Sequence, residues 1–220
     1  MAKKKKKDLT DVLEDLKAAD TEKEKAEELP EPTVQLASYE HIRDSMQTGD
    51  IIAFDGDGIF SQGINLAIGK CKNDHYISHA AMVLRTTAHS EGIVQLIEST
   101  SLGNSFAGVQ ITRMSDHVKY YEGKIWWYPI RRDIQVRVKP MLKWLMAQEG
   151  KEYDLPQALL SALDFVPQRE DFSKLFCSEL CSEGLERGGV IGEVISSRIN
   201  PVELIDDYFE IYEKPFFIDK

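Results

Sequence analysis

The segment FCSELCSEGL, residues 176–185, is the stretch of the sequence that says most about the fold. Its apolar positions fall on one side of an α-helix, and Gly188 and Gly189 predict the end of that helix. These apolar positions are Phe176, Leu180, Cys181 and Leu185. Cys177 falls outside the apolar stripe, in the first turn of the predicted helix.

The place of Cys177 in this helix favours a reactive thiol. Backbone N–H groups and the positive end of the helix dipole stabilise a thiolate, and they lower a cysteine pKa from about 8.5 toward roughly 3.5 to 7.5. Cys181 lies one turn deeper on the apolar stripe, where a small buried side chain is expected. Taken alone, the position of Cys177 fits a structural role as well as a chemical one.

Two apolar runs upstream of this helix, Ala80–Leu84 and Ile93–Ile97, predict an antiparallel hairpin. If the polar stretch between them is centred at residues 88 and 89, residues whose numbers sum to 177 face each other. His79 then lies opposite Glu98, with Cβ atoms about 4.5 to 5.5 Å apart. A histidine and a glutamate so placed form a surface pair more often than a catalytic one, so the hairpin alone does not assign them a role.

The rest of the chain from residue 38 onward alternates strand-like and helix-like segments, which predicts an α+β domain. Expected strands are 51–54, 109–111 and 124–130, and expected helices are 39–46, 59–69, 140–148 and 157–164.

The first residues differ sharply in composition from this domain. Residues 1–30 hold eight lysines and nine acidic residues and no aromatic residue. Such a segment buries too little apolar surface to order itself. We therefore predict a charged N-terminal arm over residues 1–37, mobile or docked on a larger assembly, followed by one domain over residues 38–220.

Charge and hydropathy exclude several classes of protein. The 220 residues carry a net charge of -10, the wrong sign for wrapping nucleic acid, so no nucleic-acid partner is expected. No apolar stretch reaches the roughly 18 to 20 residues of a membrane span, and no signal peptide is apparent, so a cytoplasmic location is the default expectation.

Cofactors and metals are not expected either. The glycine-rich loop at residues 55–58 lacks the spacing of a phosphate-binding motif. Three cysteines form no zinc pattern, and His75, four residues before His79, has no third and fourth ligand at a suitable spacing. The remaining histidines, His41, His89 and His117, stand in polar contexts and are expected to be exposed.

Five short motifs together resemble a known family. GDII at 49–52, SHAAMV at 78–83, IES at 97–99, GKEYD at 150–154 and FCSEL at 176–180 occur in this order in the circularly permuted branch of the NlpC cell-wall peptidases, the YiiX/YebB-like proteins. The resemblance covers roughly residues 38–215. It implies a permuted papain-like fold, with a small antiparallel sheet packed against helices.

The resemblance also implies roles for particular residues. By position, Cys177 corresponds to the nucleophile, His79 to the base and Glu98 to the polar third member. Cysteine-dependent amide hydrolysis needs these three groups, and the Cys177 N–H suits one half of an oxyanion hole. Tyr153 is expected to line the substrate cleft.

The function implied is that of a cysteine peptidase or amidase acting on peptidoglycan. A thiol acyltransferase or lipid amide hydrolase is an alternative within enzymes, and a structural protein, for example of a virion, is an alternative outside them. No signal peptide is apparent, so such an enzyme would need delivery in a phage particle, release by lysis, or a cytoplasmic substrate.

Overall fold

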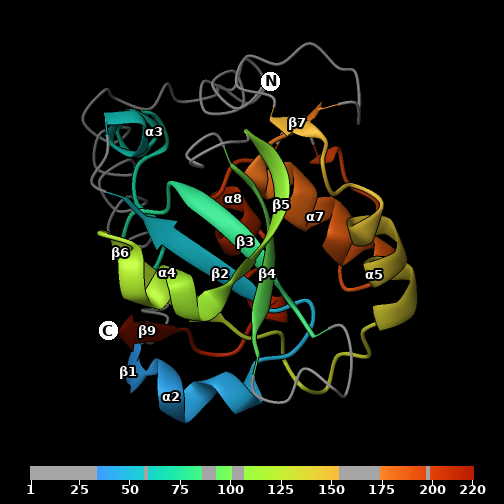
Figure 1. Cartoon of the computed structure of the whole chain (residues 1–220), viewed down its shortest axis with the longest axis horizontal. Coiled ribbons are helices and arrows are strands. Elements are labelled where there is room, and N and C mark those ends of the chain that lie inside the picture. The colour runs from blue at the N-terminus through green and yellow to red at the C-terminus, as the bar shows by residue number, and fades with distance from the viewer. Residues whose placement is uncertain (1–33, 57–58, 86–92, 101–106, 154–173, 197–198) are drawn as a thin grey trace, which may run out of the picture. The chain divides into compact units, whose positions relative to one another are not determined.

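A nine-stranded sheet is the centre of the computed structural model, which describes residues 34–56, 59–85, 93–100, 107–153, 174–196 and 199–220 (Figure 1). The strand order is β1-β9-β6-β2-β3-β4-β5-β7-β8. The strands are β1 Gln35–Ser38, β2 Ile51–Asp55, β3 His79–Leu84, β4 Gln95–Thr100, β5 Gly108–Arg113, β6 Lys124–Tyr128, β7 Glu152–Tyr153, β8 Lys174–Leu175 and β9 Phe216–Asp219.

The predicted α+β class is confirmed, whereas the predicted small antiparallel sheet is wrong in two respects. The sheet is larger than expected, and its pairs β1/β9 and β7/β8 are parallel. Both parallel pairs join segments far apart in the sequence, and no local turn signal announces such a pairing.

Six helices and two short 3-10 turns accompany the sheet in the described residues. The helices are α2 Tyr39–Ile42, α3 Ile59–Ile68, α4 Met114–Tyr120, α5 Val138–Met146, α7 Cys177–Arg187 and α8 Glu203–Asp206, and the 3-10 turns are Arg43–Ser45 and Phe209–Ile211. The helix expected over residues 157–164 lies outside the described residues.

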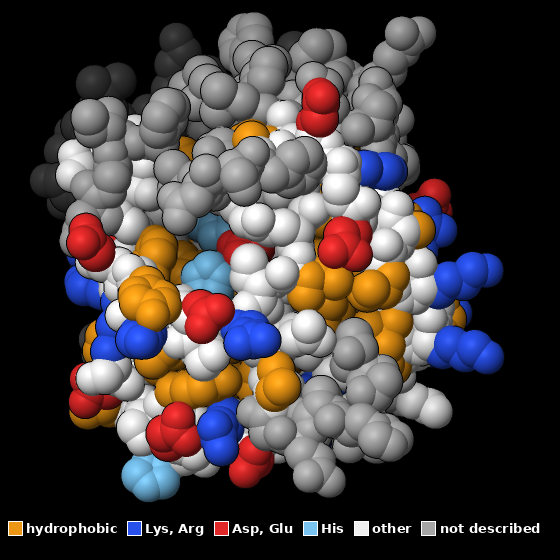
Figure 2. Space-filling view, in the orientation of Figure 1, with side chains coloured by type: hydrophobic (Ala, Val, Ile, Leu, Met, Phe, Trp, Pro, Cys, Tyr) orange, Lys and Arg blue, Asp and Glu red, His pale blue; other side chains and the backbone are white. Residues whose placement is uncertain are grey.

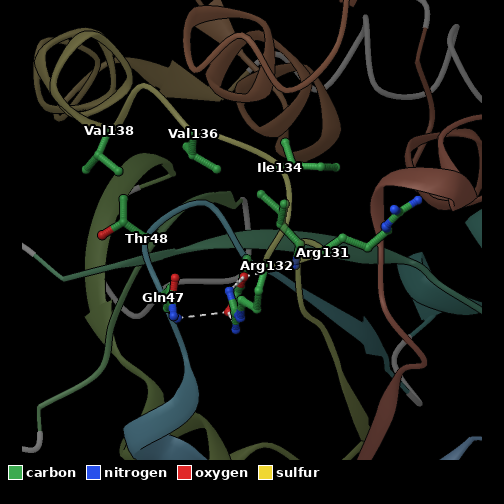
Figure 3. A pocket seen from close by; sticks show the side chains of 9 residues that line it. Gln47, Thr48, Arg131, Arg132, Ile134, Val136 and Val138 are labelled. Carbon is green, nitrogen blue, oxygen red and sulfur yellow. Dashed lines mark hydrogen bonds and ion pairs between the residues drawn. The ribbon is translucent and has the colours of Figure 1, made fainter.

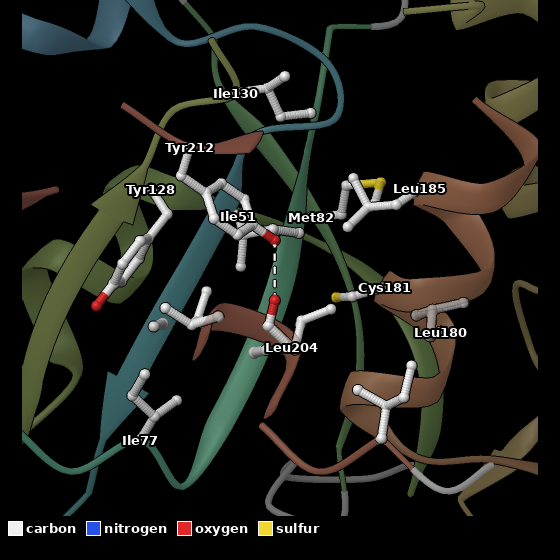
Figure 4. Close-up of a cluster of buried hydrophobic side chains, with 14 of the residues drawn as sticks. Ile51, Ile77, Met82, Tyr128, Ile130, Leu180, Cys181, Leu185, Leu204 and Tyr212 are labelled. Carbon is white, nitrogen blue, oxygen red and sulfur yellow. Dashed lines mark hydrogen bonds between the residues drawn. The ribbon is translucent and has the colours of Figure 1, made fainter. Parts of the chain in front are cut away.

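The sheet is buried on both faces, which explains why its central strands are almost continuously apolar. One face packs with Leu180, Cys181 and Leu185 of α7 and with Leu145 of α5. The other face packs with Tyr39 and Ile42 of α2 and Met114 of α4. Figure 4 shows part of the first core, where Tyr212 donates its hydroxyl hydrogen to the Leu204 carbonyl at 3.2 Å.

Helix α7 is buried from Cys177 to Leu185 because it contacts β3, β4 and α5. Its buried polar side chains have partners within the fold. Ser178 donates to the Ile199 carbonyl at 2.6 Å, and Glu183 accepts hydrogen bonds from Ser196 and Arg187. The helix predicted from residues 176–185 therefore begins at Cys177, and it ends before Gly189, whose φ is +67°.

The hairpin of β3 and β4 has a different register from the expected one. Met82 pairs with Ile97 and Leu84 with Gln95, so paired residue numbers sum to 179 instead of 177. The change moves each partner by two residues. Because side chains alternate faces with a period of two, His79 and Glu98 still lie on the same face, as diagonal neighbours.

The expected domain boundary falls inside a strand. Residues up to 33 of the predicted arm lie outside the described residues, but Gln35–Ala37 belong to β1, which pairs with β9. Among the described residues, no helix is long and apolar enough to cross a membrane.

Candidate active site

Cys177 is the first residue of α7 and is 4% exposed. The preceding residue, Phe176, has extended backbone geometry, so the chain turns into the helix at the cysteine itself. Glu179 reaches back and accepts a hydrogen bond from the Phe176 N–H at 3.4 Å. The thiol therefore lies where the unpaired N–H groups of a helix N-terminus gather.

Donors around the thiol favour its ionised form. Burial raises the pKa of Cys177, but hydrogen bonds from His79 and from the backbone N–H groups of Ala80 and Ser178, with the charge of His79, lower it further than burial raises it. The net effect is a pKa below the ordinary value. Cys181 receives no such donors, and burial raises its pKa well above the ordinary value.

The end of the β3/β4 ladder explains how Cys177 reaches these donors. Val83 donates its N–H to the Asp50 carbonyl before β2, so by alternation the Ala80 N–H points toward β4. The ladder with β4 begins only at Met82, which leaves that N–H without a strand partner. Cys177 comes from the helix on one face, His79 and Glu98 lie on the other, and they meet at this gap in the sheet.

His79 links the thiol to a carboxylate. Its Nε2 lies 2.8 Å from Glu98 Oε2, which leaves Nδ1 for the hydrogen bond with Cys177. Burial lowers the pKa of His79, but the Cys177 thiolate and the Glu98 carboxylate raise it more strongly, to about 10. The imidazole is therefore held as a cation, and it keeps an exposed fraction of 18%.

Glu98 is 2% exposed, and three polar side chains donate to it. His79 occupies Oε2, while Thr112 Oγ1 and His117 Nε2 lie 2.7 and 2.8 Å from Oε1. Burial raises the pKa of Glu98, but the hydrogen bonds from His117 and His79 and their charges hold it well below its usual range. The carboxylate stays ionised.

The expectation that His117 is exposed is wrong. Its side chain is 20% exposed, lies 5.1 Å from the Phe54 ring and bonds Glu98. Figure 2 shows histidine side chains at the surface near the middle of this view, with apolar and acidic side chains beside them. Helix α4, which carries His117, is absent from the sequence prediction, and no motif marks it.

Tyr153 lies on β7, next to the strand that leads into α7. It pairs with Leu175, two residues before Cys177, and its side chain is half-buried. Its neighbour Asp154 lies outside the described residues. The predicted role of Tyr153 in binding substrate stays a prediction.

His75 belongs to a separate cluster. Its ring stacks on Trp126 with centroids 4.0 Å apart, and its Nε2 lies 2.8 Å from the Tyr128 hydroxyl. Burial lowers the pKa of His75 to about 4, so it is neutral at pH 7. Within the described ranges, no group of three or more His, Cys, Asp or Glu side chains is arranged to hold a metal ion.

A pocket at the other end of β2 is lined by polar and apolar side chains (Figure 3). They include Gln47, Thr48, Arg131 and Arg132 on one side and Ile134, Val136 and Val138 on another. Arg132 bonds both carboxylate oxygens of Asp50, and Arg131 bonds Asp133, so these guanidinium groups already have anionic partners. The pocket does not contain Cys177, His79 or Glu98.

No family model and no curated protein matches the chain. The crystal structure of the metalloprotein yiiX from Escherichia coli O157:H7 is 17% identical, with a TM-score of 0.48. The match covers 79% of this chain and 89% of that one.

Proposed function

We propose that this protein is a cysteine hydrolase that cleaves amide bonds through a thioester on Cys177. The observation that carries the proposal is the hydrogen-bonded series Cys177, His79 and Glu98, with the thiol at the start of a buried helix. A nucleophile, a base and a group that orients the base, in hydrogen-bond reach of one another, are the arrangement that thiol hydrolysis requires.

Each group has a definite part in the proposed reaction. The Cys177 thiolate attacks the carbonyl carbon, and the oxyanion that forms accepts a hydrogen bond from the Cys177 N–H. The protonated His79 gives its proton to the leaving amine as the C–N bond breaks. Water then attacks the thioester and passes a proton to His79, and the C–S bond breaks to release the acid and the thiolate.

The fold we propose for this site is the permuted papain-like one. In the sequence the histidine strand β3 precedes the cysteine helix α7, which is the chain order implied by the motif resemblance. The helix packs on the sheet and presents its first residue to that strand. Both features support the proposal.

The substrate class we propose is peptidoglycan peptide, cleaved as an endopeptidase or amidase would cleave it. The support is the set of motifs around 49–52, 78–83, 97–99, 150–154 and 176–180, three of which contain the groups of the site. The alternative substrates are acyl lipids, on which a thiol acyltransferase or a lipid amide hydrolase would act. Docking of residues 1–37 on a larger assembly such as a phage particle stays a prediction.

Incubation of the purified protein with muropeptides and, separately, with acyl lipids tests the proposal, with products identified by mass spectrometry. Cys177→Ala should abolish cleavage of muropeptides. Cys181→Ala is the matched control, because this thiol lies one turn away and is buried in the core, and it should retain cleavage. Turnover of acyl lipids alone would reassign the substrate class, and no turnover of either by the wild type would favour a structural role.

A further inference from the structure

Glu98 has more donors than the orientation of His79 requires. One carboxylate oxygen accepts a hydrogen bond from His79. The other accepts hydrogen bonds from Thr112 of β5 and His117 of α4. Thr112 Oγ1 and His117 Nε2 are themselves 3.0 Å apart. A carboxylate that is 2% exposed has little water to replace any donor that is removed.

The proton positions in this group follow from the acceptors present. An ionised carboxylate only accepts hydrogen bonds, so a donor must face each of its oxygens. The Thr112 hydroxyl has a single hydrogen, which it donates to Oε1. If His117 Nε2 lacked a proton, its lone pair would face that of Oε1 at 2.8 Å, so Nε2 carries the hydrogen.

We infer that Thr112 and His117 form a clamp on Glu98, and that this clamp positions the carboxylate that holds His79 against Cys177. Both are positioning residues, since neither bonds Cys177 or His79. The inference rests on the proposed function, because a clamp on Glu98 has a role only if His79 serves the thiol.

The clamp comes from elements outside those that carry the three candidate catalytic residues. Glu98 pairs with Gln110 across β4 and β5, which places Thr112 on the same face of the sheet. His117 lies on α4 and packs against Phe54 of β2. The titratable groups that the described residues place around Glu98 are His79, His117 and Cys181, and Cys177 lies beyond His79.

The test uses variants that remove a donor and keep its shape. Thr112→Val loses the hydroxyl and keeps the volume. His117→Phe loses the Nε2 donor and keeps a ring against Phe54, whereas His117→Gln restores an N–H donor at a similar reach. Each variant and the double variant Thr112→Val/His117→Phe are compared with the wild type, with Cys177→Ala as the background for the other two thiols.

The readout is the rate of Cys177 alkylation by iodoacetamide between pH 4 and 9, which reports the thiolate without any substrate. In the wild type the alkylation rate should stay high at pH values well below the ordinary cysteine pKa of about 8.5. In the double variant the midpoint of the pH profile should lie about one unit higher, which is about a tenfold lower rate at pH values below both midpoints. His117→Gln should stay near the wild type. A role in folding alone would lower the unfolding temperature and leave the pH profile of the folded protein in place.

Two results separate the clamp from the proposed function. If the wild-type rate itself rises only near the ordinary cysteine pKa of about 8.5, the thiolate and imidazolium pair is absent and the proposed function fails. If the wild type keeps its rate at low pH and the double variant has the same profile, the clamp is overturned. Should the double variant not fold, Thr112→Val alone decides, because it changes one hydroxyl to a methyl group.

Discussion

His79 lies between a thiol and a carboxylate, and the charge on each of these groups depends on the other two. The thiolate and Glu98 raise the pKa of the imidazole to about 10, and the imidazolium in turn lowers the pKa of both partners. Such coupled groups titrate as a unit. A change in one of the three side chains should therefore appear in the behaviour of the other two.

Replacement of Glu98 by glutamine removes the charge and keeps the shape of the side chain. General acid–base catalysis contributes about 10²- to 10⁴-fold to a rate, so loss of the orienting charge should remove a sizeable part of that factor from kcat. Cys177→Ala should cost more, because it removes the proposed nucleophile. Measured muropeptide cleavage gives the ranking.

Asp55→Asn is the control for Glu98→Gln. Asp55 stands at the end of β2, and its carboxylate accepts a hydrogen bond from Asn65 at 2.8 Å. Its loss should leave kcat near the wild-type value. If Glu98→Gln had wild-type activity and Asp55→Asn turned over slowly, Asp55 and not Glu98 would be the residue that orients His79.

The pKa shifts of Glu98 and His79 predict how the stability of the protein depends on pH. Glu98 has a folded pKa below its ordinary value of 4.5, so its contribution is complete above pH 4.5 and is lost as the pH falls. His79 has a folded pKa of about 10 against an ordinary 6.5, so its contribution is complete below pH 6.5 and is lost toward pH 10. Between pH 4.5 and 6.5 both contributions are complete.

The unfolding temperature of the wild type should therefore exceed that of Glu98→Gln by the widest margin between pH 4.5 and 6.5. The margin should shrink on either side of this range. Thermal scans across pH 3 to 10 measure it, with the exposed residue change Glu193→Gln as the reference for buffer effects. A margin that stays constant with pH would show that the stabilisation does not come from these charges.

At the scale of elements, the distance between α7 and β3 determines whether the thiol reaches the imidazole. Gly184 of α7 faces Met82 of β3 and Leu145 of α5. A Cβ atom on Gly184 would lie 2.9 Å from Met82 Cε and 3.2 Å from Leu145 Cδ2. Both neighbours are fully buried, so the absence of a side chain at residue 184 is what permits the contact.

Gly184→Ala should lower both stability and activity. Overpacking of a core costs about 1 to 3 kcal/mol, and the gain in helix propensity returns about 1 kcal/mol. The helix would move away from β3, which carries His79. Gly63→Ala is a matched change in α3, where nothing lies within 4 Å of the added Cβ, and it should stabilise. Urea unfolding measures the change in the free energy of unfolding for each variant. A change in the same direction for both variants would contradict the packing argument.

The sequence predicts the helix and the strands that carry the site better than it predicts where their side chains come into contact. The period of three and four in residues 176–185 predicts α7, and the alternation of faces keeps His79 and Glu98 together although the register differs by two residues. The gap in the β3/β4 ladder that admits Cys177 has no sequence signal, because it depends on packing. The sequence does not predict His117 at the site because α4, the helix that carries it, has no sequence signal, and its contact with Glu98 depends on packing.

At the scale of the whole molecule, Asp50 ties together segments that are remote in sequence. It is fully buried and accepts hydrogen bonds from the Gln47 N–H, the Trp127 Nε1, the Ile130 N–H and the Arg132 guanidinium, at 2.9 to 3.1 Å. Burial raises its pKa, and the hydrogen bonds from Arg132 and from the backbone counter that rise only in part.

Asp50→Ala should be strongly destabilising, because it leaves Arg132 and the buried donors of Trp127 and Ile130 without their acceptor. The Arg132 side chain is 35% exposed, so water can solvate its charge, and the loss should come mainly from the buried Trp127 and Ile130 donors, at about 1 to 3 kcal/mol each. Asp133→Ala removes the partner of Arg131 from an exposed pair and should leave the unfolding midpoint unchanged. Equal midpoints for the two variants in urea would show that Asp50 is not a structural anchor.

The place of β9 in the sheet has a consequence for biosynthesis. Residues 216–219 form the strand between β1 and β6, so β1 finds its neighbour only after nearly the whole of this sequence has been translated (Figure 1). His79 is translated 98 residues before Cys177, and Glu98 is translated 79 residues before it. A nascent chain thus presents the imidazole and the carboxylate before the thiol, and the contacts that lower the pKa of Cys177 form only when synthesis has passed α7.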